Sequence, residues 1–193
     1  MTARFGTGSG DTATIAANAA TYLGTFRASA DGQTEFKIGG MAAGGGIASL
    51  LVWNAYNRVP ISPQVQDSTA NWADTGDGAY HPFNAGGTGS GLNNRIQYVR
   101  GLNEDTINAW MTSNVGSAGG QTCQMAIGVD STTSASGFKS YKEGSAIENI
   151  YARNCGLLGG LGFHYLQALA YSSGSTITWY GNGNSALWAE TRY

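Results

Sequence analysis

Short segments in which the side chains alternate between two faces recur along this chain, and turn-forming residues separate them. In NNRIQYVRGL (93–102), Ile96 and Tyr98 fall on one face and Gln97 on the other, and QTCQMAIGVD (121–130) and LGFHYLQALAYS (161–172) follow the same rule. A period of two is that of a β-strand, whereas an amphipathic helix repeats about every 3.6 residues. Helical periodicity is almost nowhere sustained, so the sequence predicts an all-β protein.

Turn residues set the architecture that we expect. Asp31-Gly32 and SSGS (172–175) are among the turn signals that divide the chain into many short strands, as in antiparallel sandwiches and jelly rolls. The first 46 residues are rich in Gly, Thr and Ala, and GGMAAGGG (39–46) indicates a flexible break. We therefore predict an antiparallel β-sandwich, jelly-roll-like, with an extended N-terminal arm: a docking segment at 1–46 and a β-sandwich body at 47–193.

Charge is scarce in this sequence. Charged residues make up 11% of the 193 residues, against roughly 25% in a typical soluble domain. The formal net charge is −2 and there is no basic run, so we expect neither nucleic acid nor a membrane as a partner. A surface with so little charge is expected to be covered by neighbouring subunits, which predicts a homo-oligomer, with a trimer favoured.

Residues that commonly carry catalysis or bind metals are few or wrongly spaced. His81 and His164 are too few for a three-histidine metal site, and Cys123 and Cys155 lack the C-x-x-C spacing of a zinc site. No G-x-S-x-G elbow is present. His164 shares a strand face with Leu166 and small apolar residues, so we interpret it as a packing residue. The sequence thus predicts no enzyme activity, no cofactor and no metal.

Aromatic side chains are the best candidates for ligand or interface contacts. The segment DSTANWADTGDGAYHPFNAGGTGSG (67–91) reads as a long loop that displays aromatic residues among turn formers, and a further tryptophan lies in the C-terminal tail. Such rings stack on sugars, or they anchor subunit interfaces, where Trp and Tyr are the usual dominant residues. We favour the interface and keep a glycan site as the alternative. The candidate residues are Trp72, Tyr80, His81, Phe83 and Trp188.

Several strand segments together resemble a family of tailed-bacteriophage virion structural proteins. The resemblance rests mainly on VWNAYNRV (52–59), NNRIQYVRGLNEDTINA (93–109) and the closing hairpin GLGFHYLQALAYSSGSTITWYG (160–181). It implies a β-sandwich component of the head, fibre or tail, made in the host bacterial cytoplasm and located in the virion. Its partners would be copies of itself and other virion proteins. The alternative function is a carbohydrate-binding, receptor-binding module of a phage fibre or tail that contacts a host-surface glycan.

Overall fold

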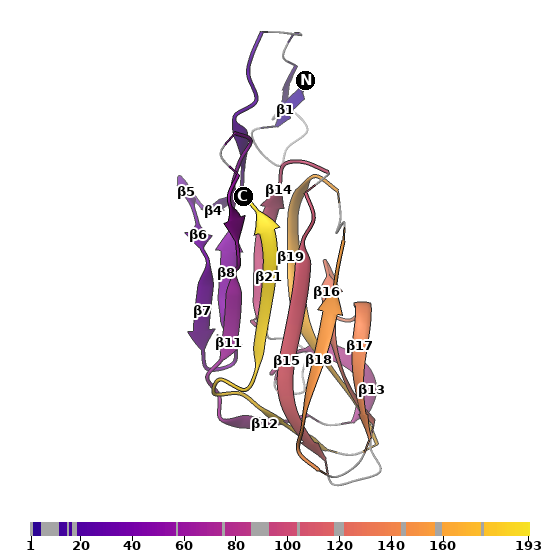
Figure 1. Cartoon of the computed structure of the whole chain (residues 1–193). Coiled ribbons are helices and arrows are strands. Elements are labelled where there is room, and N and C mark those ends of the chain that lie inside the picture. Colours follow the sequence, from indigo (N-terminus) through magenta and orange to yellow (C-terminus); the bar gives the residue numbers. More distant parts are fainter. Residues whose placement is uncertain are drawn as a thin grey trace.

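The computed structural model describes most of the chain (Figure 1). Every regular element in the described residues is a β-strand, as the alternation predicts. None of these residues forms a helix, and hence none forms a helix long and apolar enough to cross a membrane. The described residues are 2–4, 12–14, 16, 19–56, 58–74, 76–85, 93–103, 105–117, 122–143, 146–156, 160–174 and 176–193.

One continuous path of hydrogen-bonded strands curls into the two layers of the sandwich. The path turns from the first layer to the second between β17 and β18, which pair at Phe138 and Arg153. The first layer contains β6 (Phe36–Lys37), β8 (Ile47–Leu50), β14 (Arg95–Arg100), β19 (Gly162–Ser173), β16 (Thr122–Val129) and β17 (Ser136–Glu143), with β13 (Asp77–Pro82) beside β19. The second contains β18 (Glu148–Asn154), β15 (Asn108–Ser117), β21 (Ala186–Arg192), β11 (Gln64–Asp67) and β7 (Gly39–Ala42), with β10 (Pro60–Ile61), β12 (Asn71–Asp74) and β20 (Ile177–Tyr180) attached.

The alternation in sequence becomes the two faces of each layer. Ile96 of β14 lies opposite Leu166 of β19, which in turn lies opposite Val129 of β16, so one row of apolar side chains crosses the first layer. Ile96 and Leu166 are almost fully buried, as are Met111 of β15 and Leu187 of β21 from the second layer. Burial of such a side chain contributes about 1.5–3 kcal/mol, so the space between the layers is the core that holds the fold together.

Strands from the predicted arm border both layers. Among the described strands the pairing is antiparallel except for β7 with β11 and β8 with β14, which are parallel. The chain passes from one layer to the other in the turn between β7 and β8. Gly45 in this turn has φ +106°, and a Cβ on it would lie 2.3 Å from the Asn94 side chain, so the turn requires glycine. The predicted boundary at residue 46 falls in this turn, and the division of the chain there stays a prediction.

The remaining N-terminal strands form short two-stranded ribbons, and all of these ribbons lie at one end of the molecule (Figure 1). β1 (Thr2–Arg4) and β2 (Thr12–Thr14) make a hairpin that projects beyond the body. β3 (Gly24–Phe26) pairs with β9 (Val52–Asn54), and β4 (Ala28–Ala30) pairs with β5 (Gln33–Thr34). We call this end, where the hairpin projects, the apical end.

The segment 67–91 departs from the sequence-based prediction. We predicted a long loop, but its described part contains β12 and β13. Trp72 lies opposite Trp179 and Tyr80 opposite Tyr171, so aromatic side chains from distant strands hold these segments in the sheets. This pairing is non-local, and the local turn residues therefore gave the wrong prediction. Thr75 and residues 86–91 of the segment lie outside the described residues.

Candidate functional site

Two of the five candidate residues lie in a cluster of aromatic rings. The ring of Trp72 meets that of Phe83 edge-on, at 4.8 Å between centroids, and Phe83 contacts Trp179 at 5.1 Å. Phe83 is 2% exposed and Trp179 is fully buried. Such edge-to-face pairs add about 0.5–1.5 kcal/mol beyond their burial. In this arrangement the ring of Phe83 supports the sandwich and is not open to a ligand.

Tyr80 and His81 are half-buried on β13 and have partners within the chain. The Tyr80 hydroxyl donates to Gln124 Oε1 at 2.6 Å, and burial raises the pKa of Tyr80. His81 Nε2 lies 2.7 Å from Asp77 Oδ2. The Ala79 amide donates to Asp77 at 3.0 Å, and this bond, followed by the contact with His81, lowers the pKa of Asp77. These two residues form separate pairs and do not converge on one site.

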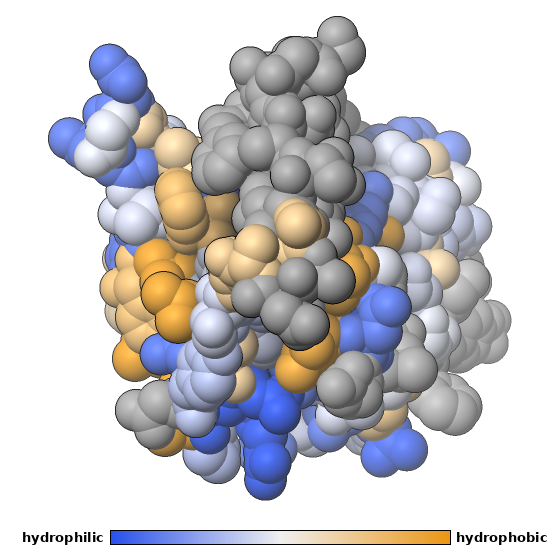
Figure 2. Space-filling model, turned by 90° about the horizontal axis from the view of Figure 1, so that it is seen from above, coloured by the Kyte–Doolittle hydropathy of each residue, from blue (hydrophilic) through white to orange (hydrophobic). Residues whose placement is uncertain are grey.

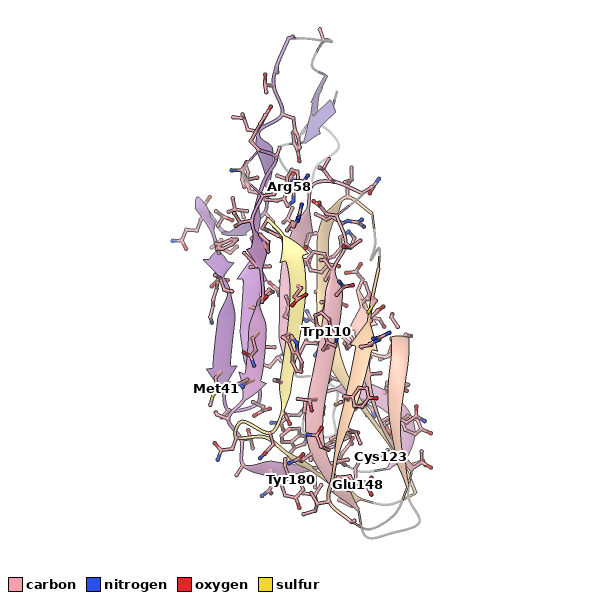
Figure 3. All side chains as sticks on the ribbon, viewed as in Figure 1. Met41, Arg58, Trp110, Cys123, Glu148 and Tyr180 are labelled. Atoms are coloured by element: carbon pink, nitrogen blue, oxygen red, sulfur yellow. The ribbon has the colours of Figure 1, made fainter. Side chains whose placement is uncertain are left out.

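Trp188 lies on the outer face of the second layer. Its ring is parallel to that of Trp110, with 6.4 Å between centroids and 19° between planes, and the two residues are opposite each other on β21 and β15. Gln64 and Arg153 occupy the same cross-strand row on either side of the pair. Figure 3 shows Trp110 near the middle of this layer. We call Gln64, Trp188, Trp110 and Arg153 the tryptophan row.

His164 has an acidic partner that the sequence did not reveal. Its Nδ1 lies 2.6 Å from Asp130 Oδ2, and its Nε2 lies 2.9 Å from the Gly160 carbonyl oxygen. The ring also packs on Tyr98, with 5.6 Å between centroids. Our interpretation of His164 as a packing residue is therefore incomplete, because the side chain also makes a polar contact with the Asp130 carboxylate. With both nitrogens engaged, the ring has no open position for a general base.

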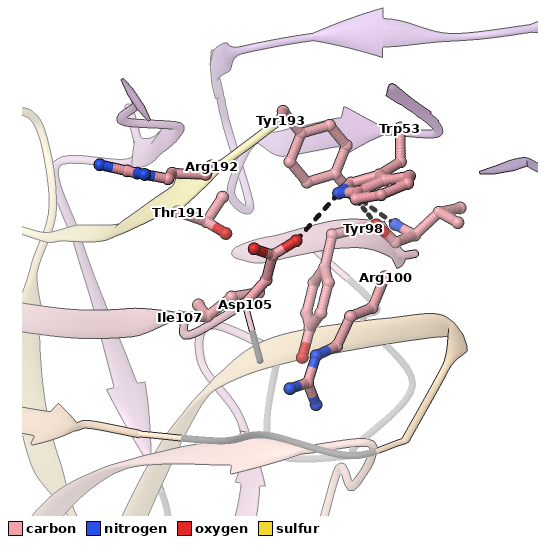
Figure 4. A pocket seen from close by; sticks show the side chains of 9 residues that line it. Trp53, Tyr98, Arg100, Asp105, Ile107, Thr191, Arg192 and Tyr193 are labelled. Carbon is pink, nitrogen blue, oxygen red and sulfur yellow. Dashed lines mark hydrogen bonds between the residues drawn. The ribbon is translucent and has the colours of Figure 1, made fainter. Parts of the chain in front are cut away.

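A polar joint connects the apical end to the body (Figure 4). Asp105 accepts a hydrogen bond from Trp53 Nε1 at 3.2 Å and a second one from Arg58 Nη1. The ring of Trp53 packs directly on Gly101, where a Cβ would lie 2.1 Å from it. The hollow beside these residues has a volume of about 10 Å³, space for about one water molecule. It is too small for a substrate, so we regard this joint as a structural brace.

Above this brace, large apolar side chains are exposed. Phe26 and Val52 lie directly opposite each other on β3 and β9, and the Phe36 ring contacts that of Tyr193, to which Val59 is hydrogen-bonded through the main chain. Figure 2 views the molecule from this end and shows hydrophobic residues at its surface. We call six residues the apical patch: Leu23 (71% exposed), Phe26 (72%), Phe36 (48%), Val52 (40%), Tyr56 (66%) and Val59 (50%).

Neither the arrangement of possible metal ligands nor comparison with known proteins points to a further site among the described residues. Within the described ranges no group of three or more His, Cys, Asp or Glu side chains is arranged to hold a metal ion. No family model matches the sequence, and neither does any curated protein. Among the described residues, two surfaces have a distinctive composition: the apical patch and the tryptophan row. Of the five candidates predicted from the sequence, only Trp188 belongs to either of them.

Proposed function

We propose that this chain is a non-enzymatic structural protein of a tailed-bacteriophage virion, which decorates or builds the capsid, fibre or tail through its N-terminal docking arm and an oligomeric β-sandwich. The observation that carries the proposal is the apical patch, which lies at the end from which the N-terminal hairpin projects. Exposed apolar side chains beside a projecting segment are typical of a surface that is completed by other proteins. The resemblance in the strand segments supplies the virion context.

The hairpin itself supports a docking role. Among the described residues, β1 and β2 pair only with each other, and Figure 1 shows the hairpin beyond the end of the sandwich. Main-chain groups on the outer edges of a two-stranded ribbon can pair with a strand of another protein. The scarce charge of the chain is compatible with close packing among other virion proteins.

Removal of residues 1–20 tests this proposal. A larger deletion would remove β6 and β7, which pair with β8 and β11 and therefore stabilise the body. We expect the truncated protein to keep the circular dichroism spectrum and the melting temperature of the full chain, but to be missing from particles purified from a host that produces it. Quantitative mass spectrometry of the particles measures this. Incorporation of the truncated protein at the level of the full chain would contradict the docking role.

The tryptophan row favours a second candidate function, the binding of a host-surface glycan. Trp110 and Trp188 offer ring surface for stacking on the apolar face of a sugar, and the amide of Gln64 and the guanidinium of Arg153 are polar groups suited to its hydroxyls. Tyr151, two residues from Arg153 on β18, is 71% exposed and enlarges this face.

Binding to purified host polysaccharide tests this second function. We expect Trp188→Ala and Tyr151→Ala to weaken binding at least tenfold, because both remove ring surface from the site. Trp72→Ala is the matched control, since Trp72 packs on Phe83 away from this face. Absence of binding by the unmodified protein to any host polysaccharide would exclude the glycan function.

A further inference from the structure

We infer that the apical patch is the surface through which one copy of this chain contacts a second copy of the same chain. The inference deepens the proposed function, and rests on its oligomeric part, because it assigns the association of the copies to particular residues. Three properties of the described residues support it: the apolar area, the anchoring of the backbone and the balance of charge.

The apolar area of the patch matches what a stable contact between two proteins requires. An aromatic side chain has roughly 150–250 Å² of surface, so three aromatic and three aliphatic residues at the exposures given above display on the order of 600 Å². One side of a standard interface buries about 800 Å², of which somewhat more than half, about 450 Å², is non-polar. The patch is therefore large enough to form the apolar centre of such an interface. It also lies at the upper end of what monomeric proteins expose, about 300–600 Å².

Buried neighbours anchor the backbone around the patch. Trp53, between Val52 and Asn54 on β9, is 1% exposed and is anchored by its bond to Asp105. Tyr193, which contacts Phe36, accepts a hydrogen bond from the Val99 amide at 2.6 Å. Residues that are already ordered lose little conformational entropy when they are covered. An apolar surface on an anchored backbone therefore loses less conformational entropy when a partner covers it.

Charge at the apical end favours a second copy over a highly charged partner. The ionisable residues around the patch carry both signs, with Asp31 and Glu35 near Arg27 and Lys37 in the sequence. Arg27 is already placed over the Phe163 ring, 3.4 Å from its centroid. With a net charge of −2 for the whole chain, two copies can approach without strong repulsion. Two copies of the apical patch can therefore contact each other without strong charge repulsion.

Multi-angle light scattering of the full chain across the micromolar range tests the inference. We expect the unmodified protein to be an oligomer, and Phe26→Asp and Val52→Asp each to weaken self-association at least about tenfold, because each would place a charge in the apolar interface. The matched control is Ile147→Asp, which introduces the same charge at a similarly exposed apolar side chain outside the patch (61% exposed) and should leave the mass unchanged. Melting temperature and near-ultraviolet circular dichroism verify that each variant is folded.

Two results would overturn the inference: a monomeric unmodified protein throughout this range, or folded Phe26→Asp and Val52→Asp variants that associate as well as the control. Should either variant fail to fold, Tyr56→Asp replaces it, since Tyr56 is 66% exposed. Light scattering requires no virus particle, whereas the deletion of residues 1–20 is scored by incorporation into particles. Failure of self-association is therefore distinguishable from failure of the virion function.

Discussion

The apical end and the sandwich body differ in the solvent exposure of their apolar side chains. Of the eleven large hydrophobic residues exposed in the described part of the chain, six form the apical patch, and the other five lie outside it. In the body, Leu166, Met125 and Trp179 are fully buried between the layers. The body therefore contains a core of its own, whereas the apical end displays apolar residues that the described part of the chain leaves exposed.

The largest effect separating the two regions is expected from Trp179→Ala. Trp179 is fully buried and in contact with Phe83, so truncation leaves a cavity in the body and costs about 3–5 kcal/mol of unfolding free energy. Phe26→Ala, at the apical end, should change the unfolding free energy of the monomer by less than about 0.5 kcal/mol. Urea denaturation at low protein concentration measures both. Equal destabilisation by the two substitutions would remove the distinction.

Asp105→Ala should break the joint between the regions. The substitution leaves the Trp53 indole N–H without an acceptor and Arg58 without its carboxylate, at a cost of about 2–4 kcal/mol, because the Asp105 side chain is only 8% exposed. Asp130→Asn is the control: the carboxylate, which pairs with His164, is 41% exposed, and asparagine also adopts the φ of +51° found at this position, so loss of the charge should cost less than about 1 kcal/mol. A cost for Asp105→Ala as small as that of the control would show that the joint does not brace the apical end.

Two buried tyrosines next to this joint should respond differently to loss of the hydroxyl. The Tyr193 hydroxyl lies 2.7 Å from the Leu50 carbonyl oxygen and accepts from the Val99 amide, so Tyr193→Phe should cost about 1–3 kcal/mol. The buried Tyr98 hydroxyl has no hydrogen-bond partner among the described residues, so Tyr98→Phe should be neutral or slightly stabilising. Thermal unfolding of the two variants compares them directly. The reverse order would contradict this assignment of hydrogen bonds.

The smallest expected effect concerns pH and a single carboxyl of the body. Burial raises the pKa of Asp74 above its ordinary value, so the folded state holds this proton more tightly than the unfolded state does. The stability of the protein should therefore fall as pH rises from the ordinary value through the raised one. Asp74→Asn removes this dependence, and the variant should gain relative to the unmodified protein, by under about 1 kcal/mol, between about pH 4 and about pH 7. A constant difference in urea midpoint over this range would contradict the assignment.

Local patterns predicted the fold of the body well. The alternation in segments 93–102, 121–130 and 161–172 corresponds to β14, β16 and β19, because a strand with one buried face repeats every two residues. The parallel pairs of β7 with β11 and of β8 with β14 were not predictable, since the partner of a strand depends on the path of the whole chain. The same limit explains β12, whose Trp72 lies opposite the distant Trp179.

The sequence predicted the candidate sites less completely, because the residues that form each site lie far apart along the chain. The composition of the segment around Trp188 drew attention to that residue, but its stacking partner Trp110 lies on another strand, and only the register of β15 and β21 brings the rings together. His164 and Asp130 are likewise separated in the sequence and meet across strand ends. The apical patch was missed because its residues alternate like those of a buried strand.

Hydrogen–deuterium exchange of the full chain at two protein concentrations tests the central contrast most directly. If a second copy covers the apical end, the amides of β3 and β9 should exchange more slowly in the concentrated sample, while those of β14, β16 and β19 exchange at the same rate in both, because the core protects them in the monomer. Equal exchange of the apical amides at both concentrations would contradict the account.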